Sequence, residues 1–389
     1  MEKIFAILGL ILFVGGAYVL SSNKKEIKWK SVGLAFIGQL VLVFLMVKTP
    51  LWKCVEALAN GFQWFLNQSS EGINFVFGGL ETTGFVFFIN SLLPIVFVSA
   101  IIGILFHYRV LNKIITVIGK LVAKGLGVDT LVAVNGITNV FLGQSDALFV
   151  TKSYLPNAKK SAIFACCVSG MTSIAISVLG LYVSLGADMT WLLASMPLTI
   201  LSTFVITQIV MPTTYSEELI EVEADRGDSV IETMMNYANT GFKSVIGITV
   251  ALLVFLSLVF MINNLLGFIN PNITLQSIIG ILFYPLSLLM GVPVSELGMV
   301  SEIFATKLIT NETVAYGLPT FNMLSESTKA MVTVGLAGFA NLSSIGILMG
   351  GFSAVAPSKV KEVASMGIKI LLAATIVNMM SAAVIALFV

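Results

Sequence analysis

The segment from Thr138 to Phe149, TNVFLGQSDALF, places four polar side chains inside an otherwise apolar run: Asn139, Gln144, Ser145 and Asp146. Hydrophobic residues make up 57% of the 389-residue chain, and only 11% of its residues are charged. Amides, hydroxyls and carboxylates are costly to bury without partners. Polar groups kept in such a setting are therefore expected to bind a polar ligand or an ion.

The composition identifies a polytopic membrane protein. Its apolar share is too high and its charged share too low for an ordinary soluble domain. Lys and Arg number 21 against 20 Asp and Glu, a net charge of +1, so no global field attracts nucleic acid. The lipid bilayer is the expected partner, and the plasma membrane the expected location.

Eight apolar stretches are long enough to cross a bilayer, which takes roughly 20 helical residues. They are residues 4–21, 31–49, 86–108, 161–185, 190–211, 243–268, 328–354 and 365–388. Three further segments, 51–67, 111–126 and 275–292, are predicted as amphipathic or Pro-interrupted helices lying in the membrane interface. An all-α fold follows.

The distribution of charge predicts the orientation. Lys and Arg gather at 24–30, 109–124, 159–160 and 359–361, which the positive-inside bias assigns to the cytoplasm, leaving both termini outside. The hydrophilic stretch 214–242 is predicted as a solvated linker between two halves. Its acidic residues include Glu217, Glu218, Glu221, Glu223, Asp225 and Asp228.

Two segments, 129–156 and 294–318, are too polar to cross the membrane alone and too apolar to be surface loops. Each has apolar halves around a polar centre, GQSD in the first and TNET in the second. We predict two re-entrant hairpins, because irregular backbone at membrane depth is tolerated only where protein or a water-filled cavity surrounds it. Their tips should point at a binding site.

A weak internal repeat supports this interpretation. A shift of 168 positions brings Gln144 onto Glu312, Gly170 onto Gly338, and SGMTSIA (169–175) onto AGFANLS (337–343). With the predicted topology the repeats enter from opposite sides, as inverted repeats do in secondary transporters. The resulting division is 1–110 scaffold, 111–212 first transport repeat, 213–270 acidic linker and scaffold helix, and 271–389 second transport repeat.

Three segments, in this order, resemble signatures of the concentrative nucleoside transporters: LGQSDALFVTKSYL, TKLITNETVAYG and GFANLSSIGI, with LMGVP upstream of the second. The resemblance covers nearly the whole chain. It implies eight transmembrane helices, interfacial helices, two opposed hairpins and a homotrimer. It also implies that each protomer holds nucleoside between the hairpin tips and two unwound helices.

The resemblance also implies roles for particular residues. The base-binding positions are Gln144, Ser145 and Asp146, with Val178 and Phe339 as apolar neighbours, and the ribose-binding positions are Glu312, Asn341 and Ser344. A sodium ion would be bound by Asn139, Ser173 and the backbones of Leu142 and Ile174. This chain departs from the family at Asp146, where Glu is usual, and at Thr313, where Phe is usual.

The chemistry of these side chains suits a nucleoside. The amide of Gln144 offers both donor and acceptor to a base edge, whereas the carboxylate of Glu312 accepts hydrogen bonds from ribose hydroxyls. Because Asn139 and Ser173 supply hard oxygen ligands, sodium is favoured as the coupling ion. Proton coupling through Asp146 or Glu312 is the alternative.

Other interpretations of the same residues remain open at this point. Glu312 could form a structural ion pair with Lys307, and Asn341 and Ser344 could be helix-packing residues. Gly170 and Gly338 could permit close packing rather than break helices. The first hairpin tip could be a surface loop.

The expected function is ion-coupled nucleoside import by alternating access. A polytopic membrane enzyme or a channel for a small polar solute is the alternative. An enzyme is disfavoured because the only histidine, His107, is placed at a helix end away from the polar cluster.

Overall fold

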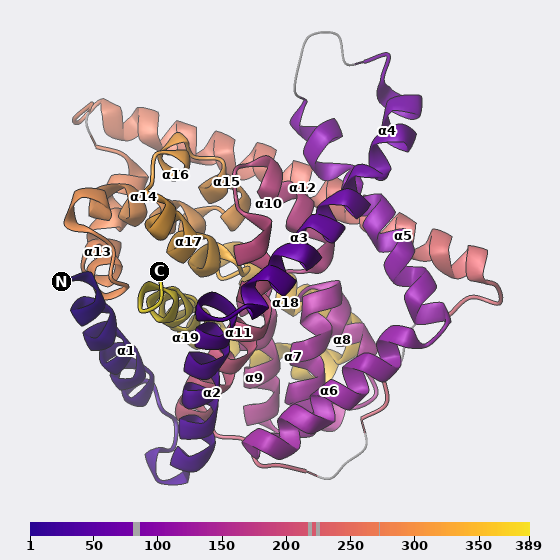
Figure 1. Ribbon diagram of the computed structural model, residues 1–389, viewed down its shortest axis with the longest axis horizontal. Helices are drawn as coiled ribbons and strands as arrows, with labels where there is room; N and C mark the ends of the chain where they lie inside the picture. The colour runs from indigo at the N-terminus through magenta and orange to yellow at the C-terminus, as the bar shows by residue number, and fades with distance from the viewer. Residues whose placement is uncertain (81–85, 217–219, 223–225, 272) are drawn as a thin grey trace.

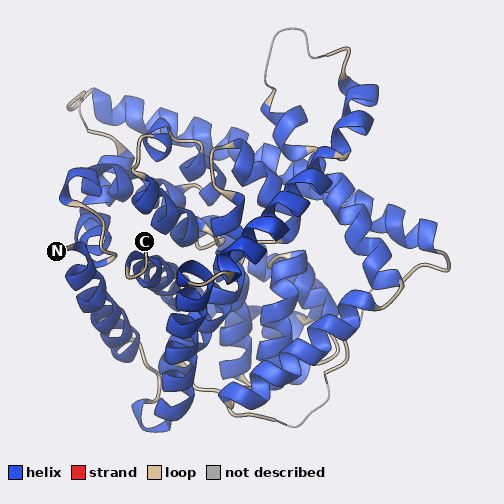
Figure 2. Ribbon diagram, in the orientation of Figure 1, coloured by secondary structure: helices blue, strands red, loops and turns tan. Residues whose placement is uncertain are grey.

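The computed structural model describes residues 1–80, 86–216, 220–222, 226–271 and 273–389. Over these residues the regular structure is helical throughout, as predicted (Figure 2). Four of the acidic residues assigned to the linker, Glu217, Glu218, Glu223 and Asp225, lie outside the described part of the chain.

The N-terminal scaffold begins with the apolar helices α1 (Glu2–Val19) and α2 (Trp29–Lys48). It continues through α3 (Leu51–Asn67), which has the predicted bounds, and α4 (Ser69–Phe77) to a short π-helical turn, Phe88–Leu92, that leads into α5. Helix α5 (Pro94–His107) has proline at its first position, where the missing N–H costs no helical hydrogen bond.

The first repeat runs from α6 to α11. Its helices are α6 (Val110–Leu126), α7 (Thr130–Leu142), α8 (Asp146–Val150), α9 (Lys160–Thr172), α10 (Leu179–Ser184) and α11 (Met189–Val210). The segment between α9 and α10 contains extended residues and a single 3-10 turn, Ile176–Val178. The predicted span 161–185 is therefore a broken helix.

Helix α12 (Val230–Gly267) corrects the predicted extent of the linker. The linker was expected to reach residue 242, but the helix begins at Val230, because the Ser229 hydroxyl accepts from the backbone N–H of Glu232 at 3.1 Å and caps it. The long helix α12 runs behind the rest of the chain (Figure 1) and packs along α5.

The second repeat has the same order of elements, apart from one additional short helix, α16. Its helices are α13 (Leu275–Leu289), α14 (Leu297–Ile309), α15 (Glu312–Tyr316), α16 (Pro319–Asn322), α17 (Glu326–Leu336), α18 (Leu342–Val355) and α19 (Val360–Ala386). The predicted span 328–354 is interrupted between Leu336 and Leu342, so it too is a broken helix.

The packing of the two repeats is reciprocal. Interfacial helix α6 packs on α7, and its counterpart α13 packs on α14. The short tip helix α8 of the first repeat packs on α18 of the second, whereas the tip helix α15 of the second packs on α10 of the first. Each polar tip therefore lies against the broken helix of the other repeat.

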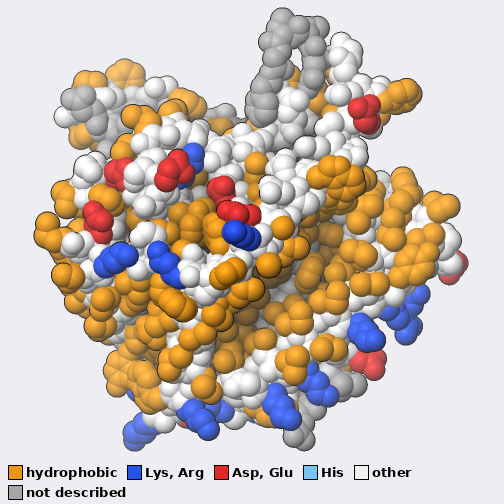
Figure 3. Space-filling view, viewed as in Figure 1, with side chains coloured by type: hydrophobic (Ala, Val, Ile, Leu, Met, Phe, Trp, Pro, Cys, Tyr) orange, Lys and Arg blue, Asp and Glu red, His pale blue; other side chains and the backbone are white. Residues whose placement is uncertain are grey.

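Seven helices or helix pairs in the described ranges are long and apolar enough to cross a membrane, and the broken pair α17–α18 covers the eighth predicted span. Apolar side chains cover much of the surface, while Lys and Arg gather along the lower edge of the face in Figure 3. This is the surface of a multi-pass membrane protein.

Candidate functional site

The first tip is a sharp turn between α7 and α8. Gly143 has φ +82°, a backbone conformation that side-chain-bearing residues rarely adopt, so glycine allows the chain to turn there. At the other end of α7, the carboxylate of Asp129 accepts from the backbone N–H of Leu131 at 2.9 Å and caps the helix. Gln144 and Ser145 follow Gly143, and Asp146 starts α8.

Gln144 and Asn139 lie against α9. A Cβ built on Gly170 would be 3.0 Å from the Cβ of Gln144 and 3.7 Å from Oδ1 of Asn139, so a larger residue would crowd the tip. Asn139 Nδ2 donates to Oδ1 of Asn135 at 3.1 Å and to Oγ of Ser169 at 3.3 Å. Gly170 therefore permits close packing between the hairpin and the broken helix.

The two helix breaks meet at the first tip. A Cβ on Gly143 would be 3.3 Å from that of Ala175 in the first break and 3.9 Å from Cε2 of Phe339 in the second. The breaks also touch each other, because a Cβ on Gly338 would be only 2.6 Å from the carbonyl oxygen of Thr172. Phe339 is half-buried beside the tip, as an apolar neighbour of a ligand would be.

The second tip carries Glu312 at the start of α15. Asn311 caps this helix by accepting from the N–H of Val314 at 2.9 Å. Glu312 is only 5% exposed, and its Oε1 accepts from the Tyr182 hydroxyl at 3.0 Å and from Oγ1 of Thr313 at 3.4 Å. Tyr182 belongs to α10, so both tips contact the first broken helix, on opposite sides of its break.

Asn341 has a structural role. Its Oδ1 accepts from the N–H of Ser344 at 3.0 Å, from Oγ of Ser344 at 3.0 Å and from Oγ of Ser343 at 2.7 Å, which caps α18. Within the described ranges its Nδ2 has no hydrogen-bond acceptor. The amide nitrogen is the part of Asn341 that remains for a ligand.

Four buried polar atoms of the predicted site residues have no partner in the described part of the chain. They are Oδ1 of Asn139, Oε1 of Gln144, Oγ of Ser173 and Oε2 of Glu312. An unsatisfied buried polar atom costs about 1–3 kcal/mol. Their location at the tips and the first break indicates a site that a polar ligand completes.

The oxygen atoms near the first tip fit a sodium ion. Asn139 Oδ1 and Ser173 Oγ are free side-chain acceptors. The carbonyls of Leu142 and Ile174, at the ends of broken helical segments, accept no backbone hydrogen bond from the described residues. Neutral and backbone oxygens are suitable ligands for a hard cation.

The structural ion pair between Glu312 and Lys307 does not form. Lys307 Nζ donates to the backbone oxygen of Gly335 at 2.9 Å instead, and no ion pair within 4.0 Å joins it to Glu312 over the described residues.

Val178 is buried in the 3-10 turn after the first break. The structure thus gathers the sequence-predicted residues at two tips and two breaks.

Tyr182 is the residue that sequence reasoning missed. It lies inside an apolar stretch, GLYVSL, so its type and spacing gave no sign of a role. Its role is seen only in its contact with Glu312. The Tyr182 hydroxyl donates to one carboxylate oxygen and so positions the carboxylate, whose other oxygen has no partner in the described structure.

Tyr182→Phe should weaken binding of the nucleoside that the resemblance implies more than tenfold while the fold persists, because a hydrogen bond to a charged group contributes about 1.5–3 kcal/mol. Tyr316→Phe is the matched control, since its ring lies 4.9 Å from that of Tyr182 but its hydroxyl donates to the carbonyl of Thr333. Isothermal titration with purified protein measures both affinities. Equal losses of affinity in the two variants would show that the Tyr182 hydroxyl has no specific role in the site.

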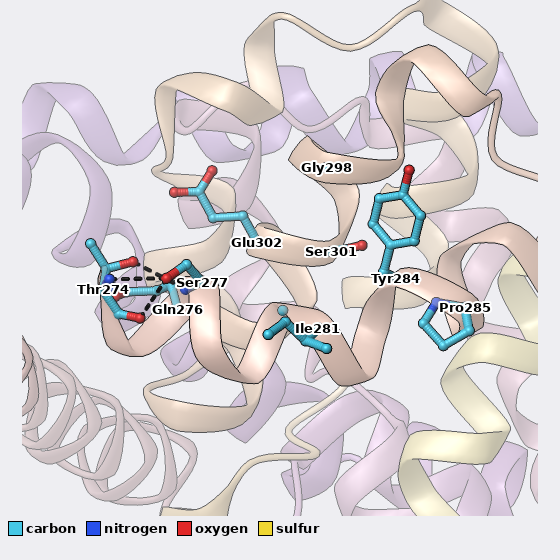
Figure 4. Close-up of a pocket in the computed structure, with 10 residues that line it drawn as sticks. Thr274, Gln276, Ser277, Ile281, Tyr284, Pro285, Gly298, Ser301 and Glu302 are labelled. Carbon is cyan, nitrogen blue, oxygen red and sulfur yellow. Dashed lines mark hydrogen bonds between the residues drawn. The ribbon is translucent and has the colours of Figure 1, made fainter. Parts of the chain in front are cut away.

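One cavity of the described structure lies away from the tips. It measures about 500 Å³ and lies between α13 and α14, lined by residues such as Thr274, Ser277, Tyr284 and Glu302 (Figure 4). Thr274 and Ser277 already satisfy each other through a capping box, and Ile281 on its wall is 70% exposed. None of the unpartnered site atoms lines it, so we place the site at the tips.

Comparison with known proteins identifies the family. Sequence models described as "Na+ dependent nucleoside transporter N-terminus", "Nucleoside recognition" and "Na+ dependent nucleoside transporter C-terminus" match residues 8–80, 88–189 and 191–386. The chain is 32% identical to "Nucleoside permease NupC" of Helicobacter pylori, over 100% of this chain and 98% of the relative.

Solved structures match the whole chain. CNTnw in an inward-facing substrate-bound state matches with a TM-score of 0.94 at 32% identity, covering 100% of this chain and 98% of that one. A CNTnw variant in an outward-facing state matches with a TM-score of 0.93 at 32% identity, covering 100% and 99%. The chain belongs to the Na+-dependent nucleoside transporter family, and it is a transporter, not an enzyme.

Proposed function

We propose that this chain imports nucleosides across the plasma membrane together with sodium, by alternating access. The observation that carries the proposal is the set of four unpartnered buried polar atoms at the first tip, the first break and the second tip. The oxygens of Gln144 and Glu312 suit a nucleoside, and those of Asn139 and Ser173 suit a cation. Coupling would follow from their contact with the same broken helix.

In the proposed binding mode the two faces of the nucleoside meet different tips. Gln144, Ser145 and Asp146 contact the base, with Val178 and Phe339 as its apolar surroundings. Glu312, Ser344 and the free amide nitrogen of Asn341 bind the ribose. The unpartnered oxygens of Gln144 and Glu312 support this assignment, because each is an acceptor that lacks a donor in the described structure.

The proposed sodium site comprises Asn139, Ser173 and the carbonyls of Leu142 and Ile174. A bound sodium ion would hold the first tip against the first break and place positive charge near Asp146. The description of the family as Na+ dependent supports sodium over a proton. Asp146 or Glu312 would take the coupling role if protons drove transport.

Alternating access is supported by relatives in different states. CNTnw structures are described as inward-facing and outward-facing, and this chain matches both. The reciprocal packing of tips on broken helices would let one repeat move against the other around the site. A channel would instead need a continuous pore.

Assembly and orientation complete the proposal. Helix α12 exposes apolar side chains, among them Leu253, Phe260 and Leu265, which would face lipid or the other subunits of a homotrimer. The positive-inside bias favours both termini outside. The units proposed to move are 111–212 and 271–389, each with its hairpin (129–156 and 294–318), on a scaffold of 1–110 and 213–270.

Uptake by proteoliposomes distinguishes these possibilities. We expect a panel of nucleosides to compete for saturable uptake that an imposed sodium gradient drives above equilibrium. Uptake that never exceeds equilibrium under any gradient would indicate a channel, and uptake driven by a pH gradient alone would indicate proton coupling.

The two-face binding mode predicts separable effects on specificity. Gln144→Ala should change the ranking among bases, whereas Asn341→Ser should reduce the discrimination between ribosides and deoxyribosides, because a site built for a hydroxyl penalises its absence. Serine is chosen because it still caps α18. Competition by nucleosides and deoxynucleosides measures both, and equal shifts of one preference in both variants would contradict the model.

A further inference from the structure

The internal repeat pairs the proposed sodium ligand Asn139 with a lysine. The shift of 168 residues that brings Gln144 onto Glu312 also brings Asn139 onto Lys307. Asn139 lies in the last turn of α7, and Lys307 lies in the last turn of α14, its counterpart in the second repeat. The two residues therefore occupy equivalent places before the two tips.

Their surroundings are equivalent too. Asn139 Nδ2 donates to Ser169, in the last turn of α9, before the first break. Lys307 Nζ donates to the carbonyl of Gly335, in the last turn of α17, before the second break. In both repeats the carboxyl ends of two half-helices converge, and each such end carries partial negative charge that favours a cation.

The places of Asn139 and Lys307 differ in the source of the cation. At Asn139 a buried oxygen is left without a partner, so an exchangeable ion can complete the site. Lys307 is 3% exposed and brings its own ammonium group. That ammonium has one hydrogen bond in the described structure, and it lines a cavity of about 10 Å³ beside Asn378, whose two amide atoms are both unpartnered.

We propose that Lys307 is a tethered cation occupying the repeat-related counterpart of the sodium site, so that the charge of the second tip is balanced by the chain itself. Each tip then has one carboxylate, Asp146 or Glu312, and one cation, exchangeable in the first repeat and covalently fixed in the second. The fixed cation is why only the first repeat responds to sodium. This inference rests on the sodium coupling proposed for this chain.

The test replaces Lys307 with the residue of the other repeat. For wild type, Lys307→Asn and Lys307→Met, nucleoside Kd is measured by titration calorimetry over a sodium series at constant ionic strength, with choline as the replacement. The melting temperature of nucleoside-free protein is followed over the same series. By linkage, the slope of log Kd against log sodium counts the ions that bind with nucleoside.

We expect the slope of wild type to correspond to one ion and that of Lys307→Asn to about double, because asparagine offers an oxygen to a second sodium. Lys307→Asn should also melt lower than wild type in choline and regain stability in sodium. Lys307→Met, which lacks both charge and oxygen, should bind nucleoside weakly, keep the wild-type slope and gain no extra stability from sodium.

A Lys307→Asn variant with the wild-type slope would overturn the inference alone, whereas a flat wild-type line would overturn sodium coupling and the inference with it. If Lys307→Asn does not yield folded protein, the reciprocal variant decides. Asn139→Lys should bind nucleoside with an affinity independent of sodium, and sodium-dependent or absent binding in that variant would overturn the inference.

Discussion

Replacing Glu312 with glutamine should abolish nucleoside uptake while membrane insertion and assembly persist. One carboxylate oxygen accepts from the hydroxyls of Tyr182 and Thr313, and the other has no partner in the described structure. Glutamine turns one of these acceptors into a donor, which leaves either Tyr182 or the ligand facing another donor. The expected cost is about 1–3 kcal/mol in binding, and loss of the carboxylate charge adds to it.

Glu302→Gln is the matched control. It removes a carboxylate from the same helix, α14, that leads to the second tip, but its side chain lines the cavity beside α13 (Figure 4). Radiolabelled nucleoside uptake by proteoliposomes, with the amount of inserted protein quantified, compares the two. Normal transport by Glu312→Gln, or an equal loss in Glu302→Gln, would remove Glu312 from the substrate site.

Replacing external sodium with choline at fixed pH should abolish concentrative uptake. The Oδ1 of Asn139 and the Oγ of Ser173 are buried oxygens without donors, and a hard cation would satisfy both. Accumulation above equilibrium requires an ion gradient, so only equilibration should remain in choline. Uptake that ignores sodium but follows an imposed pH gradient would transfer the coupling role to Asp146 or Glu312.

Asn139→Ala should raise the sodium concentration for half-maximal transport roughly tenfold, equivalent to about 1.4 kcal/mol, because it removes one ligand oxygen. Asn112→Ala is the control, since Asn112 lies on α6 and donates to the carbonyl of Val222, away from the tips. Sodium titrations of uptake measure both. An unchanged sodium requirement in Asn139→Ala would exclude this ligand.

The sequence by itself determined the membrane class, the helical elements and the polar clusters. Long apolar runs with few charges have no stable alternative to membrane helices, so composition and length were sufficient. The polar tips at Gln144 and Glu312 were visible for the same reason, because polar residues are exceptional inside such runs. The repeat shift of 168 residues related the two tips without any coordinates.

Local sequence was less informative where helix boundaries depend on capping and packing. The linker prediction extended to residue 242 because the segment is hydrophilic, yet α12 begins at Val230 under the Ser229 cap and packs along α5. The polar first turns of a helix, stabilised by a cap and a neighbouring helix, resemble a loop in composition.

Tertiary structure alone decided which groups meet. Tyr182 and Glu312, which are in contact, are 130 positions apart in the sequence. Lys307 bonds to Gly335 instead of forming the ion pair with Glu312 that the sequence allowed. Asn341, expected to bind substrate, also caps α18 with its oxygen. Such assignments depend on the distances and directions of individual donors and acceptors, which are set only in the folded chain.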